Sequence, residues 1–244
     1  FTSYGDGVAV GDQPISFNPT AMRDPVNRVP MFIFGTGKYV GKPDRTSSIP
    51  QQVYYGIRDY GTCRSGSPAC SIYPITPASL EEQVMTQAPR TGGDGKVYQV
   101  RTIEKNATPL VGARGWKLLL GSYDNTNSGM SASPGERAQR RAFPFYSANL
   151  AMLFTLTPRG EDPCAPGNDY GFVIVDAATG SFSSSNGPVT SAVVGVSLPS
   201  SRPLGSPTVP PGGGDVKITG IDNLTLPPDI VDAVESALKG ADDV

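Results

Sequence analysis

Hydrophobic residues in this chain of 244 residues fall in short runs or alternate with polar residues, and glycine or proline interrupts them repeatedly. Such a pattern, bounded by turn-forming residues, is typical of β-strands. It predicts single strands at Pro30 to Val40, Gln51 to Asp59, Lys96 to Arg101, Gly115 to Leu120, Asp169 to Asp176, Ser191 to Val196 and Asp215 to Gly220. The longest segment, Arg137 to Thr157, predicts a hairpin of two buried strands that turns near Ser147 to Asn149.

Helical patterns are few. Ser79 and Glu82 have the spacing of a capping box, which predicts one or two helical turns over Ser79 to Met85. Near the end of the chain, Ile230, Val234 and Leu238 share one face of a predicted amphipathic tail helix. That helix can dock on its own domain or face another subunit, and docking on its own domain is the preferred interpretation.

Many short strands with so little helix predict an all-β fold of the sandwich, barrel or propeller type. The 29 glycines and 24 prolines agree with a chain that turns often. A propeller blade takes about 40 to 50 residues, so a chain of this length would fill roughly five blades. No internal repeat is visible in the sequence.

Charge excludes some kinds of partner. Charged residues are 17% of the chain and the formal net charge is −2, so bulk electrostatic binding of nucleic acid or an anionic membrane is not expected. No apolar stretch reaches the ~18 residues of a membrane span. The chain opens at Phe1 without a signal-peptide pattern or an initiator methionine, which predicts a fragment of a longer protein.

The cysteines suggest a local link. Cys63 and Cys70 flank a short polar loop with glycine and proline, so a disulfide is favoured there over free thiols. A zinc site ranks well behind, because the chain has three cysteines and no histidine. Cys164 has no evident partner within the sequence.

Catalytic chemistry finds little support. Without histidine, Ser-His-Asp and Cys-His catalysis and histidine-ligated metals are excluded. Glu81 and Glu82 are the nearest to a hydrolytic carboxylate pair, but such pairs are common on exposed helix faces. Gly35 to Lys38 resembles a phosphate loop only briefly, since Tyr39 stands where serine or threonine should bind magnesium.

Several short motifs occur in an order that resembles a known family. They are Phe32-Ile33-Phe34-Gly35-Thr36-Gly37-Lys38-Tyr39, Gln52 to Asp59, Gly115-Trp116-Lys117-Leu118, Gly135-Glu136-Arg137, Phe154 to Pro158, Asp162-Pro163-Cys164, Val175-Asp176-Ala177-Ala178-Thr179-Gly180 and Gly205 to Val209. Together they resemble the C-terminal region of the PilY/PilC family of type IV pilus tip-associated adhesins. The resemblance covers about residues 1 to 212.

The resemblance implies a partial or complete β-propeller of four-stranded antiparallel blades in residues 1–212, the C-terminal part of a larger propeller. Residues 213–244 are then a linker, a short strand and the tail helix. It also implies a location in the periplasm, at the outer membrane surface or outside the cell at the pilus tip. The implied partners are minor pilins, the upstream part of the same protein, and a host-cell or abiotic surface.

Calcium is known in the family, but its D-x-D-x-D-G loop is missing here, so no cofactor is predicted. Asp124, Asn125 and Asn127 are weak calcium candidates, because they place oxygen ligands near Gly129. The preferred interpretation of these residues is a solvated turn, since aspartate, asparagine and glycine form turns in their own right.

Exposed aromatic residues are the remaining candidates for binding, because tyrosine and tryptophan anchor many interfaces. Tyr60 and Tyr73 lie beside the Cys63 and Cys70 loop, and Tyr123 lies in the calcium-candidate loop. Tyr54, Tyr55 and Trp116 are further candidates, but aromatic residues in strands more often pack between sheets, and Trp116 is expected in the core. The leading hypothesis is a non-enzymatic adhesion and pilus-assembly module. The alternatives are a secreted all-β carbohydrate-active hydrolase and a purely structural propeller fragment.

Overall fold

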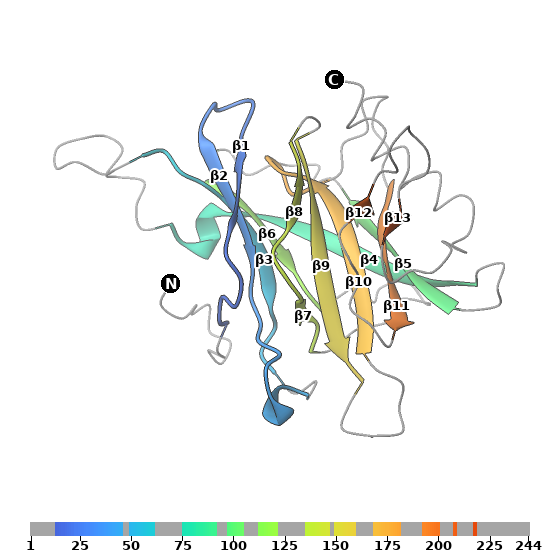
Figure 1. Ribbon diagram of the computed structural model, residues 1–244. Helices are drawn as coiled ribbons and strands as arrows, with labels where there is room; N and C mark the ends of the chain where they lie inside the picture. Colours follow the sequence, from blue (N-terminus) through green and yellow to red (C-terminus); the bar gives the residue numbers. More distant parts are fainter. Residues whose placement is uncertain are drawn as a thin grey trace.

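The structure, a computed structural model, describes residues 13–45, 49–61, 75–91, 97–104, 112–121, 135–146, 149–159, 168–181, 192–200, 207–208 and 217–218. Over these residues the protein is built from β-strands (Figure 1). The helical segments among them are two single turns of 3-10 helix, η1 (Lys42–Asp44) and η3 (Pro77–Ser79). The prediction of an all-β fold is therefore confirmed.

Four antiparallel strands form one side of the fold. Their hydrogen-bonded order is β1 (Thr20–Arg23), β2 (Pro30–Gly35), β3 (Val53–Arg58) and β6 (Gly115–Leu119). Alternate side chains of these strands point to opposite faces. Tyr54 therefore reaches the main core, whereas Val53 and Tyr55 join Phe34 and Leu80 in a second apolar cluster.

Strand β4 (Glu81–Thr91) connects this group to a second, longer series of strands. Its first residues pair in parallel with β6, with Glu81 opposite Trp116, and its remainder pairs antiparallel with β5 (Val97–Glu104). The predicted helix over Ser79 to Met85 is therefore wrong. The segment alternates, because Gln83 and Met85 are buried and Glu82 and Val84 are exposed, and pairing on both edges outweighs the local capping signal.

The second series runs β5, β11, β10 and β9, and all its neighbours are antiparallel (Figure 1). Its strands are β9 (Leu150–Pro158), β10 (Asn168–Asp176) and β11 (Ala192–Ser200), with the short β7 (Arg137–Ala138) and β8 (Phe143–Phe145) both paired to β9. The hairpin predicted over Arg137 to Thr157 is thus confirmed, but its first arm is divided into the buried β7 and the half-buried β8. A separate pair joins β12 (Pro207–Thr208) to β13 (Lys217–Ile218).

The two ends of the strand order meet at a seam. The Thr20 hydroxyl in β1 donates to the carbonyl of Ala142, just before β8, at 2.7 Å. The Ala138 amide in β7 donates to the carbonyl of Thr36 at 3.0 Å. Side-chain and loop contacts thus bring the first strands against the last ones, and the two groups of strands enclose a common core.

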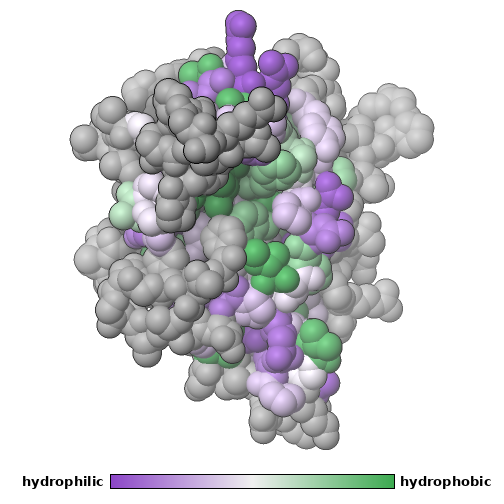
Figure 2. Space-filling model, turned by 90° about the vertical axis from the view of Figure 1, so that its left-hand side faces the viewer, coloured by the Kyte–Doolittle hydropathy of each residue, from purple (hydrophilic) through white to green (hydrophobic). Residues whose placement is uncertain are grey.

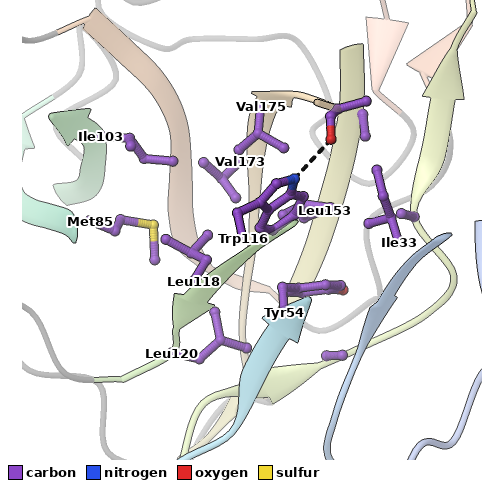
Figure 3. Close-up of a cluster of buried hydrophobic side chains, with 14 of the residues drawn as sticks. Ile33, Tyr54, Met85, Ile103, Trp116, Leu118, Leu120, Leu153, Val173 and Val175 are labelled. Atoms are coloured by element: carbon purple, nitrogen blue, oxygen red, sulfur yellow. Dashed lines mark hydrogen bonds between the residues drawn. The ribbon is translucent and has the colours of Figure 1, made fainter. Parts of the chain in front are cut away.

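The core is the buried interior between these strands (Figure 3). Trp116 is fully buried there beside Tyr54 and Leu118, with Leu153 and Val173 contributed by β9 and β10. Every residue of β9 is buried, which explains why its first half, Leu150 to Phe154, is a continuous apolar run and not an alternating one. The expectation that Trp116 lies in the core is confirmed.

The predicted blades, the domain boundary and the tail helix remain predictions. The predicted strands of residues 1–212 are present, but an arrangement of blades around an axis is not seen in the described residues. The pair of β12 and β13 links residues on either side of the predicted domain boundary at 212 and 213. The tail helix with Ile230, Val234 and Leu238 lies outside the described residues.

Candidate functional site

One end of the strands carries most of the described turns and is here called the loop end. It comprises residues 23–29 between β1 and β2, 58–61 after β3, 112–115 before β6, 145–146 and 149–150 between β8 and β9, and 176–181 after β10. Strand register places them together: Arg58 is opposite Met31, Ile57 is opposite Gly115, and Asp176 is opposite Leu150. Antiparallel pairing thus groups the first three segments and, separately, the last two. The hydrogen bonds from Arg58 to Ala178 and from Trp116 to Ala177 then join the two groups into one surface.

Arg58 ties three of these segments to one another. Its Nε forms an ion pair with Asp24 of the β1–β2 turn, its Nη1 donates to the carbonyl of Ala113 at 2.8 Å, and its Nη2 donates to the carbonyl of Ala178 at 2.8 Å. A planar guanidinium suits such a hub, because its donors point in fixed directions. One side chain at the end of β3 thus connects the β1–β2 turn, the segment before β6 and the turn after β10.

Asp24 fixes the β1–β2 turn from within. One carboxylate oxygen accepts the amides of Val26 and Asn27, each at 2.9 Å, and the other accepts the Asn27 side-chain amide and Arg58. Burial by itself would raise the pKa of Asp24. The hydrogen bonds from Asn27 and the contact with the Arg58 guanidinium together outweigh burial and hold the pKa below its ordinary value.

Asp176 organises the turn after β10 in a similar way. Its Oδ1 accepts the amides of Ala178 and Thr179, each at 2.9 Å. Here burial prevails, and it raises the pKa of Asp176 although the hydrogen bonds from Thr179 and Ala178 favour the charged form. The turn also receives the indole of Trp116, whose Nε1 donates to the carbonyl of Ala177 at 2.8 Å (Figure 3).

Exposed apolar and aromatic groups project from the loop end. Val26 is 84% exposed and Tyr146 is 68% exposed. The guanidinium carbon of Arg114 lies 5.0 Å from the centre of the Tyr60 ring, which is a cation–π distance. Figure 2 shows hydrophilic side chains that project at the upper end of the molecule, with hydrophobic ones between them. A preorganised surface of this kind is typical of a binding site on a rigid scaffold.

The opposite end holds a second ordered loop, residues 36–45. Arg137 donates from Nη1 to the carbonyls of Lys38 and Asp44, at 2.9 and 2.8 Å. The amides of Val40 and Gly41 both donate to Asp44, and these two bonds, helped by Lys38, hold the pKa of Asp44 below its ordinary value. The glycine-rich segment from Gly35 to Lys38 is thus the end of β2 followed by a loop that hydrogen bonds hold in place, and not a phosphate loop.

A fully buried ion pair lies beneath β9 and β10. Nη2 of Arg101 lies 2.7 Å from Oε1 of Glu136, and both side chains are 0% exposed. Arg101 also donates to Gln87 and Thr155, and the other carboxylate oxygen of Glu136 accepts the amide of Gly121. With each charge neutralised by its partner, this pair serves to join β5 to the segment before β7, and it is closed to solvent.

The structure places the predicted binding residues in different environments. Tyr60 lies at the loop end, partly buried against Arg114. Tyr54 and Tyr55 are buried. Glu82 forms an ion pair with Lys117 at 2.9 Å on the strand β4, so the helix face assumed for Glu81 and Glu82 does not exist. The remaining candidates lie outside the described residues, namely Tyr73, Tyr123, Cys63, Cys70, Cys164, Asp124, Asn125 and Asn127.

The sequence interpretation missed Arg58, Asp24 and Val26. One signal was available for the turn, because Asp24-Pro25-Val26-Asn27 combines residues that start and stabilise turns. No such signal exists for Arg58, since its three partners lie 34, 55 and 120 positions away in the chain.

Metal and membrane features are limited in the residues that the structure describes. These residues contain no group of three or more histidine, cysteine, aspartate or glutamate side chains arranged to hold a metal ion. No helix in the described ranges is both long and apolar enough to cross a membrane.

Comparison with known proteins relates these features to one protein. The chain is 30% identical over 169 residues to the type IV pilus biogenesis factor PilY1 of Pseudomonas aeruginosa strain UCBPP-PA14, with 64% of the chain matched. The crystal structure of the Pseudomonas aeruginosa PilY1 C-terminal domain superposes with a TM-score of 0.62 at 21% identity and covers 89% of the chain. This is a PilY1-like C-terminal domain. No model of a protein family matches the chain.

The PilY1 likeness extends over a part of that protein. The chain spans 14% of the length of the curated PilY1 and 45% of the solved PilY1 chain. Motifs that carried the family resemblance coincide with the buried contacts described above, as the bond from Trp116 to Ala177 joins two of them and the pair of Glu136 with Arg101 anchors a third. The PilY/PilC resemblance seen in the sequence is thereby confirmed.

Proposed function

We propose that the chain is a module of a type IV pilus protein that acts in adhesion and pilus assembly by binding other proteins or surfaces. The observation that carries this proposal is the sequence likeness to PilY1, a type IV pilus biogenesis factor. The likeness of fold to the PilY1 C-terminal domain agrees with that sequence match. Minor pilins and the upstream part of the same protein are the proposed partners.

The proposed mechanism is binding at the loop end. Its support is the set of contacts by which Arg58 connects three segments, together with the exposed side chains of Val26 and Tyr146. Buried acids in the described core are engaged in structure, as Glu136 is with Arg101. This arrangement favours a recognition surface over the hydrolase alternative, which requires two acids that face a cleft.

A propeller arrangement and a place at the bacterial surface belong to the same proposal. The four antiparallel strands β1, β2, β3 and β6 have the strand number and direction of one blade, which supports the propeller interpretation for residues 1–212. A propeller would present its loops at its two ends, as the loop end does here. We place the protein in the periplasm, at the outer membrane surface or at the pilus tip, without a cofactor.

Co-purification tests the proposal. The full-length protein that contains this chain is expected to retain minor pilins from its own source on an affinity column. Tyr146→Ser at the loop end is expected to reduce the retained pilins, whereas Val40→Ser at the opposite end, which removes a side chain that is 85% exposed, should not. Failure of the wild-type protein to retain any pilin or to bind any cell or abiotic surface would overturn the proposed function.

A further inference from the structure

We propose that the β1–β2 turn, residues 23–28, is a recognition tip for an acidic protein segment that carries an apolar side chain. This inference deepens the proposed function, on which it rests, because it names the chemistry of the partner at the loop end. It depends on free positive charge, an exposed apolar group and a strained backbone, which coincide within six consecutive residues.

The positive charge belongs to Arg23 and Arg28. Both residues are exposed, and within the described part of the chain no hydrogen bond or ion pair engages either guanidinium group. The one acid of the turn, Asp24, is fully buried and already paired with Arg58. Two guanidinium groups are therefore available for partner carboxylates, which they can bind in bidentate fashion.

The apolar contact is Val26, which lies between the two arginines in the sequence and is 84% exposed. A single exposed valine is unremarkable in itself. At this position, however, the backbone amide of Val26 donates a hydrogen bond to the Asp24 carboxylate, so the valine side chain is presented from a fixed turn. A partner that covers Val26 would bury an apolar group at a small cost in conformational entropy.

The backbone supplies the third observation. Arg28 has a φ of 58°, a conformation that non-glycine residues rarely adopt, and its amide is held by the carbonyl of Asp24 at 2.8 Å. Strain of this kind persists where surrounding contacts enforce it, and it is concentrated at sites of function. Glycine or asparagine would fill this position with less strain, so the presence of arginine points to a use for its side chain.

Peptide binding by the 244-residue chain tests the tip. The probe is a synthetic peptide in which glutamates surround a leucine, and its counterpart has glutamine in place of every glutamate. We expect binding of the glutamate peptide that weakens with added salt, and no binding of the glutamine peptide. The double variant Arg23→Gln with Arg28→Asn should weaken binding about tenfold, and Val26→Ser a few-fold. Asparagine tolerates the positive φ at position 28, so the turn is expected to keep its shape.

Matched controls lie at the other end of the molecule. Lys38→Gln with Arg45→Gln removes the same charge from exposed positions, and Val40→Ser removes an equally exposed valine, so neither should change binding of the peptide. Equal effects of both double variants would overturn the tip. Tighter binding of phosphatidylglycerol vesicles or of a sulfated polysaccharide than of the peptide would overturn the class of partner.

The two proposals fail in different ways. Loss of peptide binding in the tip variants together with unchanged pilin retention confirms that the tip binds acidic segments, and it shows that this binding is not used in pilus assembly. Unchanged peptide binding in the tip variants, together with pilin retention that depends on Tyr146, supports the proposed function and overturns the tip.

Discussion

The indole Nε1 of Trp116 donates to the carbonyl of Ala177 at 2.8 Å, across 61 positions of the chain. This bond joins the first residues of β6 to the turn that follows β10. Two glycines make room for the ring, because a Cβ at Gly56 or Gly180 would lie closer than 3.0 Å to its atoms. One buried side chain thus connects the two groups of strands just below the loop end.

Replacement of this tryptophan should be costly. Trp116→Phe removes the N–H donor, leaves the Ala177 carbonyl without this partner and leaves space in a fully buried site. We expect a loss of about 2–4 kcal/mol in the free energy of unfolding, measured by urea denaturation. Tyr146→Phe, at an exposed position, should stay within about 0.5 kcal/mol of the wild type. A change of similar size in both variants would contradict the structure.

Gly180 offers a separate test of the same contact. Its φ is 72° and an added Cβ would lie 2.4 Å from the Trp116 ring, whereas Gly112 has a φ of 74° with nothing within 4 Å. Gly112→Ala should therefore show the backbone strain alone, about 1 kcal/mol, and Gly180→Ala clearly more. Thermal unfolding of the two variants isolates the steric part, and equal shifts in Tm would mean that the ring is not packed on Gly180.

The buried pair of Arg101 and Glu136 should behave as a unit. Arg101→Met leaves the carboxylate of Glu136 buried without this guanidinium, and Glu136→Gln does the reverse, so each is expected to lower the free energy of unfolding by about 3–5 kcal/mol. The double variant should cost less than the sum of the two. A double-mutant cycle in urea measures the coupling, and strict additivity would show that the two groups do not interact.

Acid should weaken the loop end through Asp24. The pKa of Asp24 is lower in the folded chain than in the unfolded chain, so its contribution to stability is complete above the unfolded value of about 4 and is lost as the pH falls through the lower folded value. Asp24→Asn should be less stable than the wild type at neutral pH. The difference should shrink as the pH falls below about 4, measured by urea unfolding over a pH series.

Asp176 provides a control of opposite sign. Burial raises its pKa in the folded chain, so the charged carboxylate disfavours folding above that raised value, and the penalty disappears as the pH falls through it. Asp176→Asn, whose oxygen can still accept the amides of Ala178 and Thr179, should therefore remove a destabilising contribution at neutral pH. The same sign of pH dependence at both positions would contradict the contacts described here.

Local patterns in the sequence located many of the strands correctly. The ends of β3, β5, β6 and β10 were predicted to within three residues, because alternation and flanking glycines indicate how a strand is buried. The start of β2 was predicted correctly, but the strand ends at Gly35 and not at Val40. β4 was missed because Ser79 and Glu82 imitate a helix start, whereas pairing with β5 and β6 decides the conformation. β1 was also missed, since its four residues are too few to show a period.

The sequence by itself determined an all-β chain without histidine, its turn-rich character, and the ordered motifs that mark it as PilY1-like. Only the tertiary structure decided that Arg58 reaches Asp24, Ala113 and Ala178, and that Arg23, Val26 and Arg28 project from a turn fixed beneath them. The physical reason is the range of the interactions. Periodicity reflects burial within one strand, whereas a site at the ends of several strands depends on register and strand order, which arise from contacts between residues far apart in the chain.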